Sequence, residues 1–187
     1  MDYDDPGVHL FVPPANVTTV FVQAWGGGGG GASGFNPVSG SGGGAGGFAW
    51  CVLPVQPSTP VTVFVAAGGV GQSGESDGLV GGNSGAINSL GNFAAGRGGL
   101  GGKFLPPAGG AGGMGECNGI QGTVRQGADG SPGTFSNTAP GGLGGRPAVD
   151  GIIQPAPASA GTGGTGGAAG ADTTGDNGGN GYVVIWW

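Results

Sequence analysis

Charged side chains are scarce in this chain. Its 187 residues include ten Asp and Glu but only four Lys and Arg, which gives a net charge of −6 at pH 7. A surface that binds nucleic acid needs several clustered cations to neutralise phosphates. The four cations available here are Arg97, Lys103, Arg125 and Arg146. We therefore expect no nucleic-acid partner.

Long apolar runs and a basic leader are also missing. Nothing in the sequence approaches the roughly eighteen consecutive apolar residues that indicate a transmembrane helix, so we expect no insertion into a membrane. The opening residues, MDYDDPG, have neither the positive charges nor the apolar stretch of a signal peptide. We therefore expect synthesis in the cytoplasm without a signal peptide.

Groups suited to catalysis or metal binding are few. The one histidine, His9, lies in a short apolar run and is expected to be structural, and no serine stands in a nucleophile-elbow sequence. Cys51 and Cys117 lack the spacing of a zinc site, and their separation leaves both a disulfide and two reduced thiols open. The acidic residues at 2–5 suit a solvated or subunit-docking arm better than a metal site. We expect no enzymatic activity, no cofactor and no metal.

Glycine is present in large excess. It supplies 53 of the 187 residues, about four times the usual share of about 7%. Glycine at this density opposes α-helix formation because each one costs about 1 kcal/mol relative to alanine inside a helix. Charged residues make up only 7% and hydrophobic residues 36%, whereas disordered chains are usually polar and highly charged. We therefore expect an ordered fold with few or no α-helices.

Five short segments carry β-strand signals. They are rich in β-branched and aromatic residues and lie at residues 8–12, 17–25, 48–55, 61–67 and 182–187. Such short strands need partners, and the last segment can pair with the early ones. We therefore expect an all-β fold in a single domain over residues 1–187. An N-terminal arm and first strand at 1–16 would precede a small jelly-roll-like antiparallel β-sandwich formed by residues 17–67 and 182–187.

Two blocks between these strands hold most of the glycine, at residues 26–47 and 68–181. Within the blocks glycine often recurs at every third position, as at Gly161, Gly164 and Gly167. This period matches the extended helix of the polyproline II type, which makes no internal hydrogen bonds. Without side chains, such helices can approach closely and hydrogen-bond to one another. We expect the blocks to form a bundle of packed polyglycine helices; flexible linkers are the alternative.

The strand segments and the glycine beside them resemble a known group of proteins. Four stretches carry the resemblance: VPPANVTTVFVQAWGGGGGG, GGGAGGFAWCVLPV, VTVFVAAGG and DNGGNGYVVIWW. They are similar to the glycine-rich domains of phage tail and minor tail proteins, and to short adhesins at the ends of phage tail fibres. A more distant likeness is to the glycine-rich domain of anaplastic-lymphoma-type receptor kinases, whose extra disulfides are missing here. The resemblance spans nearly the whole chain.

The resemblance implies a non-enzymatic protein on the virion surface, on the tail or the capsid exterior. It favours a tail-tip or tail-fibre adhesin, or a minor tail protein, which binds the host surface through loops on a rigid bundle. The partners would be other virion proteins and a host-surface glycan or outer-membrane protein, with a homo-oligomer expected and a trimer favoured. The alternatives are a capsid decoration or head-fibre subunit, and an extracellular self-assembling or ice-binding protein.

Candidate receptor-binding residues lie where other residues interrupt the glycine blocks. In the adhesins that the chain resembles, loops at the tips of the polyglycine bundle contact the receptor. The corresponding candidates are Phe35, Phe93, Phe104, Asn118, Arg125 and Phe135. Exposed aromatic rings suit stacking on sugars or contact with a protein. The alternative is that these phenylalanines fill small cores between the bundle and the sheet.

Overall fold

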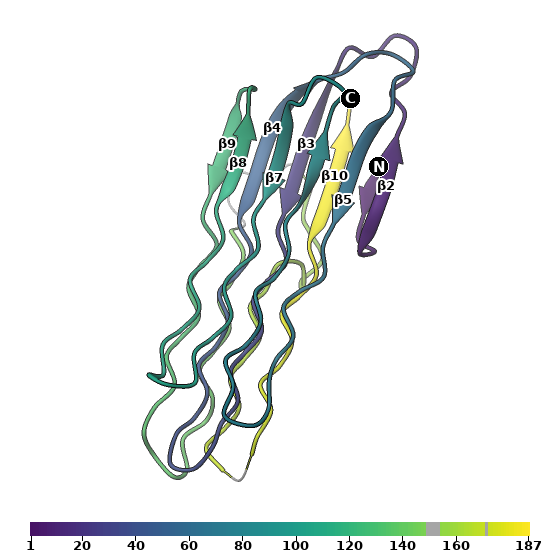
Figure 1. Ribbon diagram of the computed structural model, residues 1–187. Coiled ribbons are helices and arrows are strands. Elements are labelled where there is room, and N and C mark those ends of the chain that lie inside the picture. The colour runs from purple at the N-terminus through teal and green to yellow at the C-terminus, as the bar shows by residue number, and fades with distance from the viewer. Residues whose placement is uncertain (149–153, 171) are drawn as a thin grey trace.

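The computed structural model describes residues 1–148, 154–170 and 172–187. Within these ranges the chain forms ten β-strands and no helix. The molecule is elongated, with the strands gathered at one end and the glycine-rich segments running side by side to the other (Figure 1). The strands are β1 (Asp2–Tyr3), β2 (Gly7–Phe11), β3 (Thr19–Trp25), β4 (Phe48–Pro54), β5 (Val61–Val65), β6 (Ser84–Ile87), β7 (Phe93–Gly96), β8 (Gly115–Asn118), β9 (Gly122–Arg125) and β10 (Tyr182–Trp186).

The strands form two antiparallel five-stranded sheets. The β3 sheet has the order β1-β10-β3-β4-β9, and the β6 sheet has the order β2-β5-β6-β7-β8. The all-β class and a sandwich of antiparallel sheets, both predicted from the sequence, are confirmed. The C-terminal strand β10 lies between β1 and β3, so it pairs with early strands as its composition indicated.

Alternating side chains of the two sheets form the main core. Val20 and Val22 of β3 and Val63 of β5 belong to one hydrophobic cluster, and all three are fully buried. A disulfide between Cys51 in β4 and Cys117 in β8 joins one sheet to the other. The sequence left the state of these cysteines open, and the structure pairs them.

Four strands lie inside the block 68–181, for which the sequence predicted packed polyglycine helices and no strands. These are β6 to β9, whose sequences are SGAI, FAAG, GECN and GTVR. Such short, glycine-containing segments carry almost no local strand signal. They are strands because β5 and β4 offer them backbone edges to pair with, so tertiary context decides their structure.

The glycine-rich segments are joined by backbone hydrogen bonds with a period of three. Each N–H of residues 26–34 donates to a carbonyl of another segment at 2.8–3.0 Å. Every third N–H donates to the same neighbouring segment. Each time the residue number of the donor rises by three, that of the acceptor falls by three. The three acceptor segments are therefore antiparallel to this one; they lie at residues 38–47, 76–82 and 173–179.

The carbonyls of the same segment accept bonds from three further neighbours. These neighbours lie at residues 69–72, 99–102 and 164–167, and they run parallel to residues 26–34. Residues 38–47 are surrounded in the same way by residues 26–32, 97–100, 110–113, 128–134, 142–145 and 161–167. Residues 26–34 and 38–47 are thus two central segments, and every residue of both is buried.

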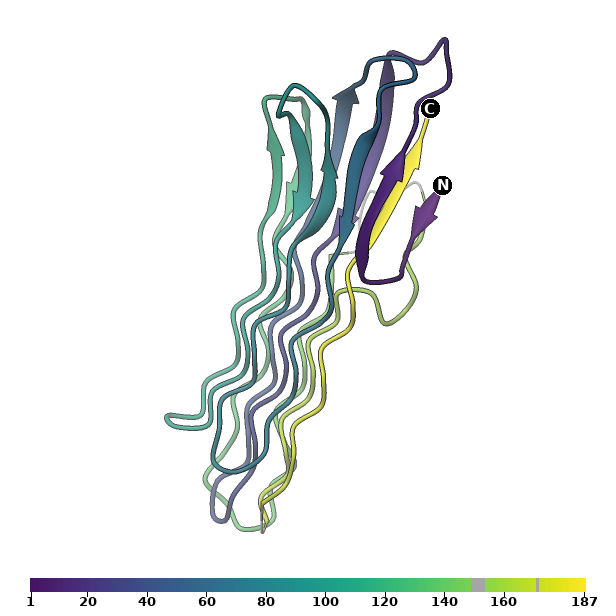
Figure 2. The same cartoon turned by 45° about the vertical axis from the view of Figure 1, so that its right-hand side comes forward.

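The outer segments also bond to one another and close a ring around the central pair. In order around the ring they lie at residues 67–72, 76–82, 97–103, 108–114, 126–134, 141–147, 161–167 and 173–180. Figures 1 and 2 show segments of the ring continuing from strands of both sheets; residues 141–147 and 161–167 are the exceptions, since they adjoin no described strand in the sequence. The bundle is therefore a continuation of the sandwich, held by bonds between segments that are distant in the sequence.

Lack of space explains the glycine of the central segments. Gly29 and Gly43 have no left-handed φ angle, so their backbone conformation would admit other residues. A Cβ on Gly29 would instead overlap the carbonyl of Leu100, and a Cβ on Gly43 would overlap the carbonyl of Gly29. The positions of these two segments that are not glycine carry small buried side chains, with the exception of the larger Val38 near the turn. The small residues are Ala32, Ser33, Ser39, Ser41 and Ala45.

Candidate functional site

Three of the six predicted receptor-binding residues meet at the end of the bundle far from the sheets. We call this end the distal tip; it contains the loops at residues 35–37, 74–77, 104–107 and 135–140. Phe35 and Phe135 both form backbone bridges with Val38, and Phe104 packs against Val38. Phe35 is 41% exposed and Phe135 is 65% exposed, whereas Phe104 is 6% exposed. Two of these phenylalanines are therefore open to solvent, and Phe104 fills a small core.

Asp77 ties two loops of the distal tip together, and sequence reasoning missed it. Its Oδ2 accepts a hydrogen bond from Lys103 Nζ at 2.9 Å, and its Oδ1 accepts one from the Phe104 N–H at 2.8 Å. Partial burial pushes the pKa of Asp77 upward, but these two hydrogen bonds and the charge of Lys103 outweigh it and lower the pKa overall. An isolated Asp in a glycine-rich turn gives no sequence signal for this role.

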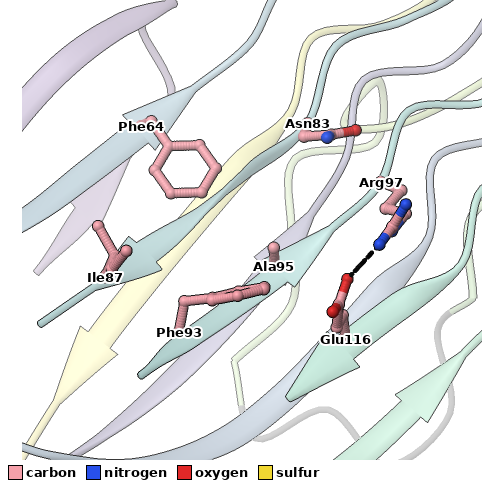
Figure 3. A pocket seen from close by; sticks show the side chains of 7 residues that line it. All are labelled: Phe64, Asn83, Ile87, Phe93, Ala95, Arg97 and Glu116. Atoms are coloured by element: carbon pink, nitrogen blue, oxygen red, sulfur yellow. Dashed lines mark hydrogen bonds and ion pairs between the residues drawn. The ribbon is translucent and has the colours of Figure 1, made fainter. Parts of the chain in front are cut away.

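Two other predicted residues, Phe93 and Asn118, are cross-strand partners on the outer face of the β6 sheet. Phe93 lines an open cavity of about 310 Å³ on this face, which we call the β6-sheet groove (Figure 3). The other lining residues are Phe64, Asn83, Ile87, Ala95, Arg97 and Glu116. Sequence reasoning singled out neither Phe64 nor the small residues between the strands, because the groove depends on strand register.

Strand register creates the groove. Phe64, Gly85, Ala95 and Glu116 stand opposite one another across β5, β6, β7 and β8, so they form one row on the outer face. The two middle members have no side chain or only a methyl group. A Cβ on Gly85 would overlap the Ala94 carbonyl, so a larger residue cannot fill this position without a backbone shift. The surface is therefore depressed over Gly85 and Ala95 and raised by the larger side chains of Phe64 and Glu116 at the two ends of the row.

Polar groups stand at one side of the groove. Arg97 donates to the Oε2 of Glu116 from Nη2 at 2.6 Å and from Nε at 3.1 Å. The side chains of Arg97 and Glu116 are 58% and 31% exposed. Asn83 accepts a hydrogen bond from the Gly98 N–H through Oδ1 at 3.0 Å. Figure 3 shows these three residues on one side and Phe64 and Ile87 on the other.

The sixth predicted residue, Arg125, lies apart from both places. It belongs to β9 at the edge of the β3 sheet, where it stands opposite Phe48. The structure therefore distributes the predicted residues over three locations: the distal tip, the β6-sheet groove and the β9 edge.

Neither a metal-binding cluster nor a membrane-spanning helix occurs in the described part of the chain. No three His, Cys, Asp or Glu side chains gather there as metal ligands would. No helix there is long and apolar enough to cross a bilayer. The His9 ring lies 5.4 Å from the Tyr3 ring, and its Nε2 is 2.9 Å from the Asp5 carbonyl oxygen.

Comparison with known families accounts for nearly the whole chain. The model of a glycine-rich domain family matches residues 5–187, which include both the sandwich and the bundle. The chain belongs to this glycine-rich domain family. A search of curated proteins finds no match. Membership of the glycine-rich domain family agrees with the resemblance seen in the sequence at the level of glycine-rich proteins, and it names neither a partner nor an activity.

Proposed function

We propose that the chain is a non-enzymatic phage virion surface protein, a tail-tip or tail-fibre adhesin or a minor tail protein. In this proposal the distal tip binds the host surface, and the bundle is a stiff spacer that holds the tip away from the sandwich. The observation that carries the proposal is the closed ring of hydrogen-bonded segments around two buried ones. Such an arrangement suits presentation of loops better than catalysis.

The proposal takes the bundled segments to be polyglycine II-type helices on a jelly-roll-like sandwich, and the bonding pattern supports the helices. Extended helices of this type have three residues per turn and no internal hydrogen bonds, so successive N–H groups point to three different neighbours. Residues 26–34 bond in this manner to antiparallel and parallel neighbours. At about 3.1 Å per residue, nine residues hold the tip roughly 28 Å from the end of β3.

The distal tip offers apolar contact groups on a firm base. Phe35 and Phe135 are exposed, as is Leu105 at 59%. The loops that carry them continue directly into bonded segments, and Asp77 joins two of these loops. Because the segments beneath are fixed, ordering the tip on binding costs less conformational entropy than ordering free loops.

The disulfide supports a place outside the cell. Disulfides persist in oxidising surroundings and are rare in the reduced cytosol. The Cys51–Cys117 bond suits a virion protein that is made in the host cytoplasm and exposed after release.

The proposal includes self-association, for which β2 supplies a surface. No described strand pairs with the outer edge of β2. Val8 is 74% exposed and Leu10 is 65% exposed, and Gly7–Phe11 contains neither a charge nor a proline. Proteins usually protect such edges, since apolar edge strands pair with other chains. Sedimentation velocity of the wild type and of Leu10→Lys tests this part: the wild type associates and the variant is monomeric. A monomeric wild type at virion-like concentrations contradicts it.

Binding to intact cells tests the main proposal. The labelled chain is incubated with a panel of bacterial strains that includes the host of the phage. We expect saturable binding, which Phe135→Ala reduces at least tenfold because an exposed aromatic anchor is lost. Leu143→Ala is the matched control, since Leu143 is similarly exposed at 69% and belongs to an outer segment of the bundle. Binding to no strain, together with no effect on phage adsorption, overturns the proposal.

Locating the protein on the virion distinguishes a tail protein from a capsid decoration subunit. Immunogold labelling at the tail supports the adhesin or minor tail protein, whereas labelling over the whole capsid supports a decoration subunit.

A further inference from the structure

We propose that the β6-sheet groove is a binding site for one ring of a neutral sugar. This site lies on the sandwich and uses none of the residues of the distal tip, so it is independent of the proposed role of the tip. The argument rests on the shape of the groove, on its two phenylalanines and on the charge balance of its polar side.

The shape suits a small, flat ligand. Gly85 and Ala95 form a floor, and the larger side chains of Phe64, Ile87 and Phe93 rise around it. The volume of about 310 Å³ is at the lower end of the range for ligand pockets, about 300–1,000 Å³. The groove therefore fits a single ring better than an extended chain. The overlap that a Cβ on Gly85 would cause with the Ala94 carbonyl keeps the floor free of a side chain.

The phenylalanines supply the apolar half of the recognition. Phe64 on β5 and Phe93 on β7 are separated by β6, and both are only partly buried. The face of an aromatic ring is electron-rich, so it attracts weakly positive C–H groups as well as apolar surface. A pyranose ring carries such C–H groups on its faces and hydroxyl groups around its edge. It can therefore pack against the phenylalanines while its hydroxyls reach toward the polar side.

The polar side selects a neutral ligand. Arg97 and Glu116 neutralise each other through a single carboxylate oxygen, Oε2. Among the described contacts, this leaves Arg97 Nη1 as a donor, Glu116 Oε1 as an acceptor and Asn83 Nδ2 as a second donor. Hydroxyl groups donate and accept, so they use these groups without disturbing the ion pair. A phosphate that bonds Arg97 would lie beside the Glu116 carboxylate, and an ammonium group that bonds Glu116 would lie beside the Arg97 guanidinium, so either charged ligand meets a like charge.

The site is tested with defined sugars and the intact chain. Glucose, galactose, mannose and N-acetylglucosamine are titrated into ¹⁵N-labelled protein, with glucose 6-phosphate and glucosamine as charged comparators. We expect at least one neutral sugar to bind saturably in the millimolar range and to shift the amide signals of Phe64, Phe93 and Glu116. The charged comparators should bind more weakly. The proposal fails if no neutral sugar shifts these signals or if a charged comparator binds more tightly.

Three variants distinguish a loss of sugar binding caused by the change in the groove from a loss caused by unfolding of the protein. Phe93→Ala should weaken sugar binding at least tenfold because it removes one wall, and Glu116→Gln should weaken it while relaxing the discrimination against phosphate. Leu90→Ala is the control, since Leu90 is 67% exposed and does not line the groove. Unfolding midpoints of all three variants are measured in parallel. Equal loss of binding in Leu90→Ala and Phe93→Ala, or unchanged binding in Phe93→Ala, overturns the proposal. Phe93→Ala should leave binding to cells through the distal tip unchanged. The proposal for the groove can therefore be refuted without refuting the proposal for the tip, and the reverse.

Discussion

Replacing Gly43 by alanine gives a direct test of how tightly the two central segments are packed. The added Cβ would overlap the carbonyl of Gly29 and would lie 2.7 Å from the carbonyl oxygen of Gly30. Real Cβ atoms essentially never approach within 3.0 Å. Both obstacles are backbone atoms of the other central segment, so no side-chain rotation relieves the overlap. The two segments must move apart.

The size of the effect follows from the bonds that this movement disturbs. Gly43 donates to the Gly164 carbonyl at 2.9 Å and accepts from the Gly145 N–H at 2.9 Å, and Gly29 donates to the Gly44 carbonyl at 2.8 Å. Each bond contributes about 1 kcal/mol net, and overpacking itself typically costs about 1–3 kcal/mol. If all three bonds are lost, we expect a decrease of about 4–6 kcal/mol in the free energy of unfolding. For a chain of this size that corresponds to a melting temperature lower by about 8–24 °C.

Thermal unfolding followed by circular dichroism or calorimetry measures this loss. Gly170→Ala is the control, because the nearest atom to its Cβ is Thr173 Cγ2 at 3.4 Å. Alanine at a position without overlap is expected to stabilise slightly, by about 0.4–1 kcal/mol, through the unfolded state. If Gly43→Ala melts at the temperature of the wild type, the central segments are not closely packed and the blocks behave as flexible linkers.

Three further outcomes follow from the same structure. Removal of the disulfide by Cys51→Ser with Cys117→Ser should lower unfolding free energy by about 4 kcal/mol, because the bond closes a loop with a sequence separation of 66; an unchanged denaturation midpoint contradicts this. In amide exchange, residues 26–34 and 38–47 should be the slowest of the glycine blocks, and immediate exchange there would refute the bonded bundle. Since Asp77 has a pKa below its ordinary value of 3.8, its ion pair should stabilise the tip above that pH and lose this effect as the pH falls through the lowered pKa; acid titrations of the wild type and Asp77→Asn should converge at low pH.

The sequence predicts the fold best where local signals are strong. β3 and β4 alternate β-branched or aromatic residues and are found almost where predicted. β6 to β9 were not predicted, because segments such as SGAI and FAAG become strands only through pairing with a neighbour. The period of three in glycine indicated an extended, bonded arrangement, but the identity of each neighbour depends on the complete three-dimensional packing.

The candidate sites were predictable only in part. Aromatic interruptions of the glycine blocks pointed to Phe35 and Phe135, which are exposed at the tip. The same pattern pointed to Phe104, which is buried, because burial depends on contact with Val38 rather than on local sequence. The β6-sheet groove could not be seen in the sequence, since its floor arises from the register that places Gly85 beside Ala95.

The bonding partners of residues 26–34 also determine when the molecule can fold. Gly28 donates to Gly179, and β10 enters the β3 sheet between β1 and β3. At about 5–20 residues per second of synthesis, the first glycine block leaves the ribosome roughly 8–30 s before these partners exist. It waits in water with almost no apolar side chains to expose, so this delay carries little risk of aggregation. The complete ring of the bundle therefore cannot close until residues 173–180 have been synthesised.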